Sequence, residues 1–137
     1  MKKEIYVLVR GIVRFKNKYL ILKKRKSNKT DSEKWECPGG KIENDEDPRD
    51  CLLREISEET GLKVRIVKEL PALERETETF RRKSYVFVAE TFSCQVIISE
   101  EHQEFRWVNP ENVQNFDLAS GASSLLVYFN NPEQYLN

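Results

Sequence analysis

Hydrophobic residues near the start of the chain form two short runs of the kind found in β-strands. Residues 6–15 (YVLVRGIVRF) are rich in β-branched and aromatic side chains, and residues 19–22 (YLIL) resume this pattern after a polar interruption. Two such runs separated by a short polar turn predict a β-hairpin. Residues 26–35 are polar and lack a period, so we expect a loop before the next element.

One segment further on carries both the start and the stop features of a helix. Asp47 and Pro48 supply an N-cap followed by proline at the first helical position, and Gly61 is a typical C-terminal cap. Neither glycine nor proline occurs between Pro48 and Gly61. A helix is therefore predicted over residues 48–60. Its expected buried face consists of Leu52, Leu53 and Ile56.

Alternating and aromatic-rich stretches in the second half of the chain predict further strands. These strands are expected over residues 63–70, 73–79, 83–92 and 105–108. A turn or brief helix should open at 109–111, a C-terminal helix should cover 119–129, and the polar tail 130–137 should fray. The order of elements predicts one α/β (α+β) domain over residues 1–137, in which a mixed sheet lies between helices.

Composition narrows the function. The 137 residues include 23 Lys+Arg and 23 Asp+Glu, so the formal net charge is zero. This balance excludes the basic field with which general nucleic-acid-binding proteins attract their ligands. No apolar run approaches the roughly 18 residues of a membrane span. The three cysteines do not suggest a disulfide framework and favour a cytoplasmic location. We expect Cys37 and Cys51 to be small buried residues.

The charges are distributed in two opposed stretches. Residues 14–29 contain eight basic side chains and no acidic one, whereas residues 43–59 contain eight acidic and two basic ones. A basic stretch suits phosphate, and an acidic stretch suits the cations that accompany phosphate. The pattern favours a small phosphorylated ligand held together with a metal ion.

Three carboxylates share one face of the predicted helix. At about 100° per residue, Glu55, Glu58 and Glu59 lie within one arc. Like charges at these spacings destabilise a helix by about 0.2–0.5 kcal/mol per pair. Such a face is commonly only solvated, but Mg²⁺ would turn the repulsion into affinity. Arg54 stands beside Glu55, and its guanidinium is suited to holding a carboxylate in a fixed orientation.

These carboxylates belong to a longer pattern. Gly40 is followed after five residues by Glu46, and after seven more by Arg54-Glu55, Ile56, Ser57, Glu58-Glu59, Thr60, Gly61 and Leu62. The segment Gly40–Leu62 resembles the Nudix box of the Nudix hydrolase family at every fixed position. The preceding WECPG, residues 35–39, resembles the entry to that box in the MutT-like branch.

The resemblance implies an α/β/α sandwich and the hydrolysis of nucleoside diphosphates linked to another group, with Mg²⁺ or Mn²⁺ as cofactor. It implies that Glu55, Glu58 and Glu59 bind metal, with the carbonyl of Gly39 as a further ligand. It also implies that Arg54 orients Glu55. Glu46 is expected to support the loop around the metal ligands.

A later loop supplies a further carboxylate in several branches of the family. Residues 99–107 (SEEHQEFRW) resemble the Glu-His…aromatic-Arg-Trp run of those branches. By that match Glu101 is the candidate fourth metal carboxylate or catalytic base. Glu58 is an alternative base and Glu104 a fallback, while His102 is expected to be a structural hydrogen-bonding residue.

Substrate contacts are predicted at Arg25, Lys41 and Phe80. Arg25 belongs to a basic run, residues 23–26, after the second strand, and a guanidinium binds phosphate through two hydrogen bonds. Phe80 is a candidate for stacking on a base, although Trp35 and Tyr85 are alternatives and packing is the commoner role of such residues.

The choice of nucleotide is less constrained. Residues 116–120 (FDLAS) lack the asparagine of enzymes that clear oxidised guanine triphosphates. Glu78 stands where the ADP-ribose branch has proline, and Phe80 where dinucleoside polyphosphate hydrolases have tyrosine. The leading hypothesis is a nucleoside triphosphate pyrophosphohydrolase, monomeric or homodimeric. The alternatives are a dinucleoside polyphosphate hydrolase and a non-catalytic nucleotide-binding module.

Overall fold

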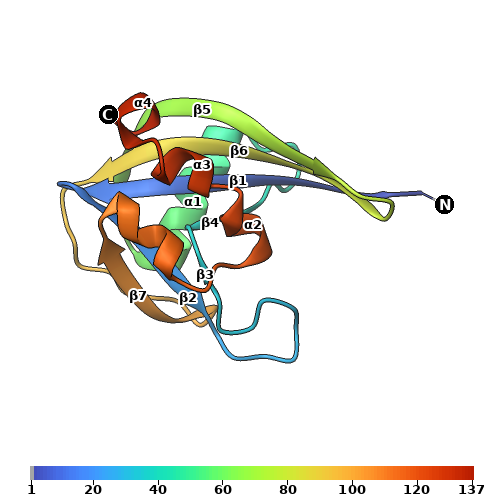
Figure 1. Ribbon diagram of the computed structural model, residues 1–137, viewed down its shortest axis with the longest axis horizontal. Coiled ribbons are helices and arrows are strands. Elements are labelled where there is room, and N and C mark those ends of the chain that lie inside the picture. The colour runs from blue at the N-terminus through green and yellow to red at the C-terminus, as the bar shows by residue number, and fades with distance from the viewer. Residues whose placement is uncertain (1) are drawn as a thin grey trace.

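A mixed sheet organises residues 2–137, the part of the chain that the computed structural model describes (Figure 1). Its main path runs β3-β2-β1-β6-β5, while β4 pairs with β1 and β7 with β2. β1 is parallel to β6 and antiparallel to β2 and β4, which confirms the predicted mixed sheet. The strands are β1 (Glu4–Phe15), β2 (Lys18–Lys24), β3 (Trp35–Glu36), β4 (Gly39–Lys41), β5 (Val64–Glu76), β6 (Phe80–Thr91) and β7 (His102–Val108).

Two of the predicted strands are one strand in the structure. The prediction of separate strands over 63–70 and 73–79 is wrong, because β5 continues from Val64 to Glu76. Pro71 interrupts the pattern, and the register with β6 shifts between Leu70 and Leu73. β5 ends the strand order, and an edge strand tolerates a proline that cannot donate to the ladder. The irregularity therefore bends the strand without ending it.

The helix α1 (Pro48–Thr60) has the predicted bounds. Asp47 accepts hydrogen bonds from two backbone N–H groups of the first turn, and the Gly61 N–H closes the last turn on the Ser57 carbonyl at 2.9 Å. Leu52 and Ile56 are fully buried, as predicted. Leu53 is 39% exposed, so its predicted burial is wrong. It projects about 60° beyond Ile56 and falls at the edge of the apolar arc.

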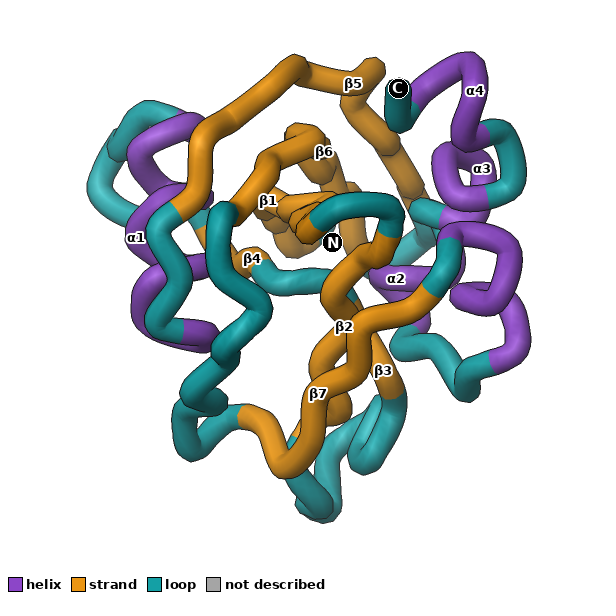
Figure 2. The backbone as a smooth tube through the Cα atoms, turned by 90° about the vertical axis from the view of Figure 1, so that its left-hand side faces the viewer, coloured by secondary structure: helices purple, strands orange, loops and turns teal. Residues whose placement is uncertain are grey.

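Helices cover both faces of the sheet, as Figure 2 shows with α1 on one side and the C-terminal helices on the other. On the first side Leu52 and Ile56 pack with Val9, Leu20 and Phe87. A second core on the opposite face combines strand residues such as Ile21 and Val88 with C-terminal residues such as Phe129. The structure thus has the expected sandwich architecture. No helix within residues 2–137 is long and apolar enough to cross a membrane.

The C-terminal region departs from the prediction in two ways. The expected helix over 119–129 is divided into α2 (Ser120–Ser123) and α3 (Leu126–Phe129), after a 3-10 helix η1 (Pro110–Asn115). The hydroxyls of Ser123 and Ser124 donate to nearby carbonyls and compete with continuous helical pairing. The tail does not fray, because it forms α4 (Pro132–Tyr135) and buries Leu136 completely.

Candidate active site

Two adjacent glycines bring β4 against both β1 and the acidic helix. A side chain at Gly39 would place its Cβ 2.0 Å from the carbonyl oxygen of Val9. At Gly40 a Cβ would lie 2.6 Å from the carboxylate carbon of Glu55. A methyl group at Gly39 would meet fixed backbone, and one at Gly40 would require the Glu55 carboxylate to move, so the glycine pair sets how closely the loop approaches the helix carboxylates.

Arg54 is the centre of the hydrogen-bond network on the exposed side of α1. Its Nε and Nη2 donate to the two carboxylate oxygens of Glu46 at 3.0 and 2.8 Å. Its Nη1 donates to Glu55 at 3.2 Å and to Glu58 at 3.2 Å. These bonds lower the pKa of Glu46 to about 2. The guanidinium therefore joins the loop before the helix to two carboxylates on the helix.

The three helix carboxylates pass from the core to the solvent. Glu59 is 3% exposed, whereas the side chains of Glu55 and Glu58 are 14% and 58% exposed. Glu59 Oε1 accepts the backbone N–H of Gly39 at 2.9 Å. The acidic face predicted from helical periodicity is therefore present, and it turns inward at its C-terminal end.

Burial raises the pKa of two of these groups. It raises the pKa of Glu59 to about 9, although the Gly39 N–H acts in the opposite direction. It also raises the pKa of Glu55, against the influence of Arg54 and with the help of the charges on Glu58 and Glu101. Sheltered carboxylates that lack sufficient positive charge are suited to a hard divalent cation. The donor set thus fits Mg²⁺ or Mn²⁺.

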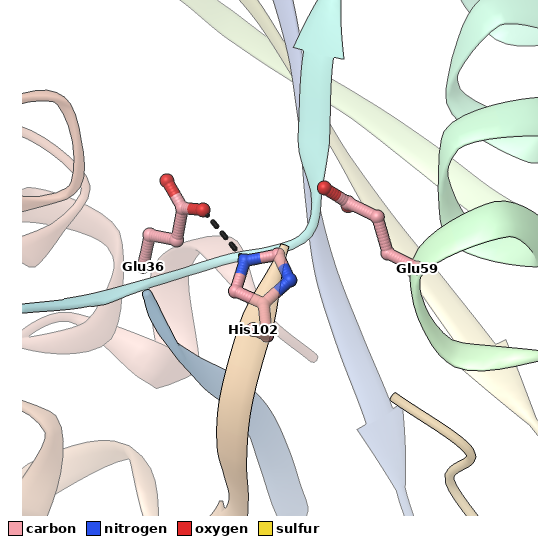
Figure 3. A group of neighbouring side chains, drawn as sticks. All are labelled: Glu36, Glu59 and His102. Atoms are coloured by element: carbon pink, nitrogen blue, oxygen red, sulfur yellow. Dashed lines mark hydrogen bonds and ion pairs between the residues drawn. The ribbon is translucent and has the colours of Figure 1, made fainter. Parts of the chain in front are cut away.

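Glu59 also belongs to a second group of side chains, together with Glu36 and His102 (Figure 3). His102 Nε2 and Glu36 Oε2 are 2.8 Å apart, and one ligand atom of each of Glu36, Glu59 and His102 lies within 4.8 Å of the others. Arg10 lies 3.6 Å from Glu36 and donates to the Cys37 carbonyl. Within the described chain, His102 Nδ1 has no hydrogen-bond partner. His102 therefore joins β7 to β3 through Glu36.

The loop before β7, which carries Glu101, contacts the C-terminal end of α1. The charge of Glu101 contributes to the raised pKa of Glu55, and the Ser99 N–H donates to the Glu59 carbonyl at 3.3 Å. Glu104 lies further along β7, where it pairs with Arg106 at 2.5 Å and Lys23 at 4.0 Å. The loop of Glu101 thus contacts the C-terminal end of α1, whereas Glu104 is engaged by cations along β7.

The predicted substrate residues lie in two different places. Arg25 is beside the Glu101 loop, where it donates to backbone carbonyls. Lys41 Nζ is 4.9 Å from the ring centroid of Tyr6, and the Phe80 ring packs edge-on against the same tyrosine at 6.2 Å. Phe80 pairs with Glu4 of β1, whereas Gly39 pairs with Arg10, six residues or about 20 Å further along the same strand. The structure therefore does not place Phe80 beside the carboxylates.

Reasoning from the sequence missed a polar cavity between the β5–β6 sheet and α2. Its volume is about 180 Å³. The lining residues are Leu73, Glu74, Arg75, Arg82, Ser84, Ser120, Ser123 and Ser124. Burial, with Arg75 and Arg10 nearby, lowers the pKa of Arg82. Alternation along β6 places Arg82 and Ser84 on one face, but nothing in the sequence pairs them with serines some forty positions later.

Together the sandwich, the glycine pair and the Arg54 carboxylate network define a Nudix hydrolase. Residues 4–129 match the model of the NUDIX domain, so the chain belongs to the Nudix family. Members of this family are hydrolases that act on nucleotide-related substrates.

Several known proteins resemble the chain along much of its length. An 8-oxo-dGTP diphosphatase of Buchnera aphidicola is 31% identical over 119 residues, covering 87% of this chain and 88% of that protein. A CTP pyrophosphohydrolase of Escherichia coli is 28% identical over 110 residues, covering 80% and 81%. An uncharacterized Nudix hydrolase of Bacillus subtilis is 29% identical, and the match spans 67% of this chain but only 61% of that protein. The crystal structure of a MutT protein from Methanosarcina mazei superposes with a TM-score of 0.82, covering 97% and 98% of the two chains at 24% identity.

Proposed function

We propose that the protein is a divalent-metal-dependent pyrophosphohydrolase that cleaves a nucleoside triphosphate into a monophosphate and pyrophosphate. The observation that carries this proposal is the arrangement of carboxylates on α1, in which Glu59 is 3% exposed and accepts the Gly39 N–H, while Arg54 joins Glu55 and Glu58 to Glu46. Burial makes the Glu59 carboxylate costly to ionise and raises its pKa. A group so costly to ionise is explained if a cation is its partner. The names of the two relatives similar along more than three-quarters of the chain, a diphosphatase and a pyrophosphohydrolase, support the same reaction class.

The residues that would hold the metal are Glu55, Glu58, Glu59, Glu101 and the carbonyl of Gly39. When bound, Mg²⁺ or Mn²⁺ neutralises the charge of the diphosphate group and lowers the pKa of a water molecule. Arg54 keeps Glu55 and Glu58 in place, and Glu46 holds Arg54 from the opposite side. The chain contributes mainly fixed positions and fixed charges, which dominate catalysis of phosphoryl transfer.

Two side chains are candidates for accepting the proton of the attacking water. Glu58 is on the solvent side of the helix, and Glu101 is exposed on the loop before β7. Glu104 is a weaker candidate because two cations already neutralise it. Replacement of each carboxylate by glutamine separates these roles. Loss of the catalytic base lowers kcat, whereas loss of a residue that only binds metal chiefly lowers the affinity for metal.

Binding of the nucleotide is assigned to Lys41 and Phe80 as a proposal, whereas the Arg25 guanidinium already donates to carbonyls of the loop that carries Glu101. Lys41 follows Gly40, whose backbone contacts Glu55, so its position supports a role close to the phosphates. Phe80 of β6 pairs with the start of β1, far from Gly39. It reaches the substrate only if the nucleotide extends past Tyr6. The cavity lined by Arg75 and Arg82 offers a second place for the nucleoside end. The monomeric or homodimeric state and the cytoplasmic location stay predictions.

A dinucleoside polyphosphate hydrolase is the second candidate, because the run from Glu101 to Trp107 resembles that branch. The two functions are separated by a panel of nucleoside triphosphates and dinucleoside polyphosphates with Mg²⁺, in which pyrophosphate and nucleotide products are measured. Pyrophosphate released from a triphosphate supports the first candidate, and cleavage restricted to dinucleotides supports the second. Turnover of neither, in protein that binds nucleotide, would leave only the non-catalytic module.

A further inference from the structure

The loop that carries Glu101 is fastened to the end of β2 by Arg25. The Arg25 Nε donates to the Glu100 carbonyl at 2.7 Å, and its Nη2 reaches the His102 carbonyl at 3.4 Å. The backbone N–H of Arg25 donates to the Glu101 carbonyl at 3.1 Å. Three successive carbonyl oxygens, centred on Glu101, thus accept hydrogen bonds from one residue.

This fastening occurs where the β2–β7 ladder is irregular. Lys23 pairs with Glu104 but Lys24 pairs with His102, so Gln103 is an extra residue on β7. A bulge of this kind leaves a residue unpaired and redirects the chain beyond it. The side chain of Gln103 instead accepts the Lys26 N–H at 3.0 Å. Beyond the bulge, hydrogen bonds from Arg25 and Lys26 replace regular strand pairing, and Glu101 projects from that segment.

Two further contacts join the same loop to β3 and to α1. His102 is bonded to Glu36 of β3, as the dashed line in Figure 3 shows. Ser99 donates its N–H to the Glu59 carbonyl at the end of α1. Within residues 2–137, however, no basic side chain pairs with the Glu101 carboxylate itself. Its location therefore depends on the backbone that Arg25, His102 and Ser99 secure.

We propose that Arg25 is a positioning residue that holds the backbone of Glu101 beside the C-terminal end of α1, and that this role, rather than binding of phosphate, is its main contribution. The inference rests on the proposed role of Glu101 as a metal carboxylate. The guanidinium suits this task because its planar fork presents Nε and Nη2 side by side to two backbone carbonyls. A lysine has one rotatable ammonium and lacks that geometry.

The two possible roles of Arg25 predict opposite effects on metal binding in the absence of nucleotide. A positive charge beside a cation site opposes metal binding, so its simple removal would leave Mn²⁺ affinity unchanged or increase it. A positioning residue acts in the other direction, because its removal releases Glu101 and lowers Mn²⁺ affinity. Loss of a group that orients a metal ligand typically reduces affinity by about 10–100-fold.

The test is a Mn²⁺ titration of the nucleotide-free full chain, followed by electron paramagnetic resonance of the free ion. Arg25→Ala and Arg25→Lys should each weaken binding about tenfold. Glu101→Gln should weaken it to a similar degree, and the double variant Arg25→Ala/Glu101→Gln should bind no more weakly than Glu101→Gln alone. Lys26→Ala is the matched control, since it removes a neighbouring exposed charge without removing these bonds, and should bind as wild type does.

The outcomes separate the inference from the proposed function. If Glu101→Gln weakens Mn²⁺ binding while both Arg25 variants bind normally or more tightly, Arg25 does not position Glu101. If Glu101→Gln itself binds Mn²⁺ as wild type does, the metal role of Glu101 fails first. Should Arg25→Ala not fold, Arg25→Lys carries the test. Steady-state kinetics give a second readout: the positioning role predicts a lower kcat, whereas a phosphate contact predicts a higher KM with kcat retained.

Discussion

Replacing Glu59 by glutamine is expected to stabilise the metal-free protein progressively as the pH rises. The unfolded chain ionises this carboxyl near its ordinary pKa of 4.5, whereas the folded protein keeps it protonated until about pH 9. Between these values the folded state binds the additional proton, so its free energy of unfolding falls with increasing pH. Glutamine has no proton to lose and can still accept the Gly39 N–H.

The size of the effect follows from the shift in pKa. One pH unit within the window corresponds to about 1.4 kcal/mol. Raising the pH from 6 to 8 should therefore lower the free energy of unfolding of the metal-free wild type by about 3 kcal/mol more than that of Glu59→Gln. Because Glu59 is almost wholly buried, solvent screening does not diminish this difference.

The assay is urea unfolding in EDTA at pH 6 and pH 8, compared between wild type and variants. Glu58→Gln is the matched control, because its carboxylate is on the same helix but is 58% exposed. The stability of Glu58→Gln should depend on pH as that of the wild type does. Adding Mg²⁺ at pH 8 should increase the free energy of unfolding of the wild type more than that of Glu59→Gln. Identical pH dependences in wild type and Glu59→Gln would refute the view that Glu59 is an uncompensated buried acid.

Three further changes test separate parts of the structure. Arg54→Lys should lower kcat at least about tenfold, because a single ammonium cannot hold Glu46 and Glu55 together; an unchanged kcat would contradict this role. Gly40→Ala should displace the Glu55 carboxylate, which lies 2.6 Å from the new Cβ, and weaken Mn²⁺ binding measured by calorimetry; normal binding would show that the loop yields instead. Leu136→Ala should reduce the free energy of unfolding by about 2–5 kcal/mol in urea, whereas a negligible change would indicate that the tail is not anchored.

Local features of the sequence were sufficient to place the helix of the active site. The bounds of α1 follow from Asp47, Pro48 and Gly61, which act within one turn of each helix end. The shared face of Glu55 and Glu59 follows from helical geometry alone. The order of elements likewise predicted the sandwich, because the apolar periods of strands and helices can be recognised without knowledge of their partners.

Features that depend on distant contacts could not be predicted in this way. The basic run around Arg25 suggested phosphate, yet the side chain donates to carbonyls about 75 positions later. The polar tail suggested fraying, yet Leu136 is fully buried in a core that residues of other elements form. Separate strands were expected on either side of Pro71, but β5 continues through it because β5 lies at the edge of the sheet. In each case a partner far along the chain decides the conformation.

The central claim is most directly tested by identifying the products formed from nucleoside triphosphates with Mg²⁺ in water enriched in ¹⁸O. We expect a nucleoside monophosphate and pyrophosphate in equal amounts, with the heavy oxygen in one of them, and a large loss of this turnover in Glu59→Gln. Release of orthophosphate and a nucleoside diphosphate, or equal turnover by Glu59→Gln, would contradict it.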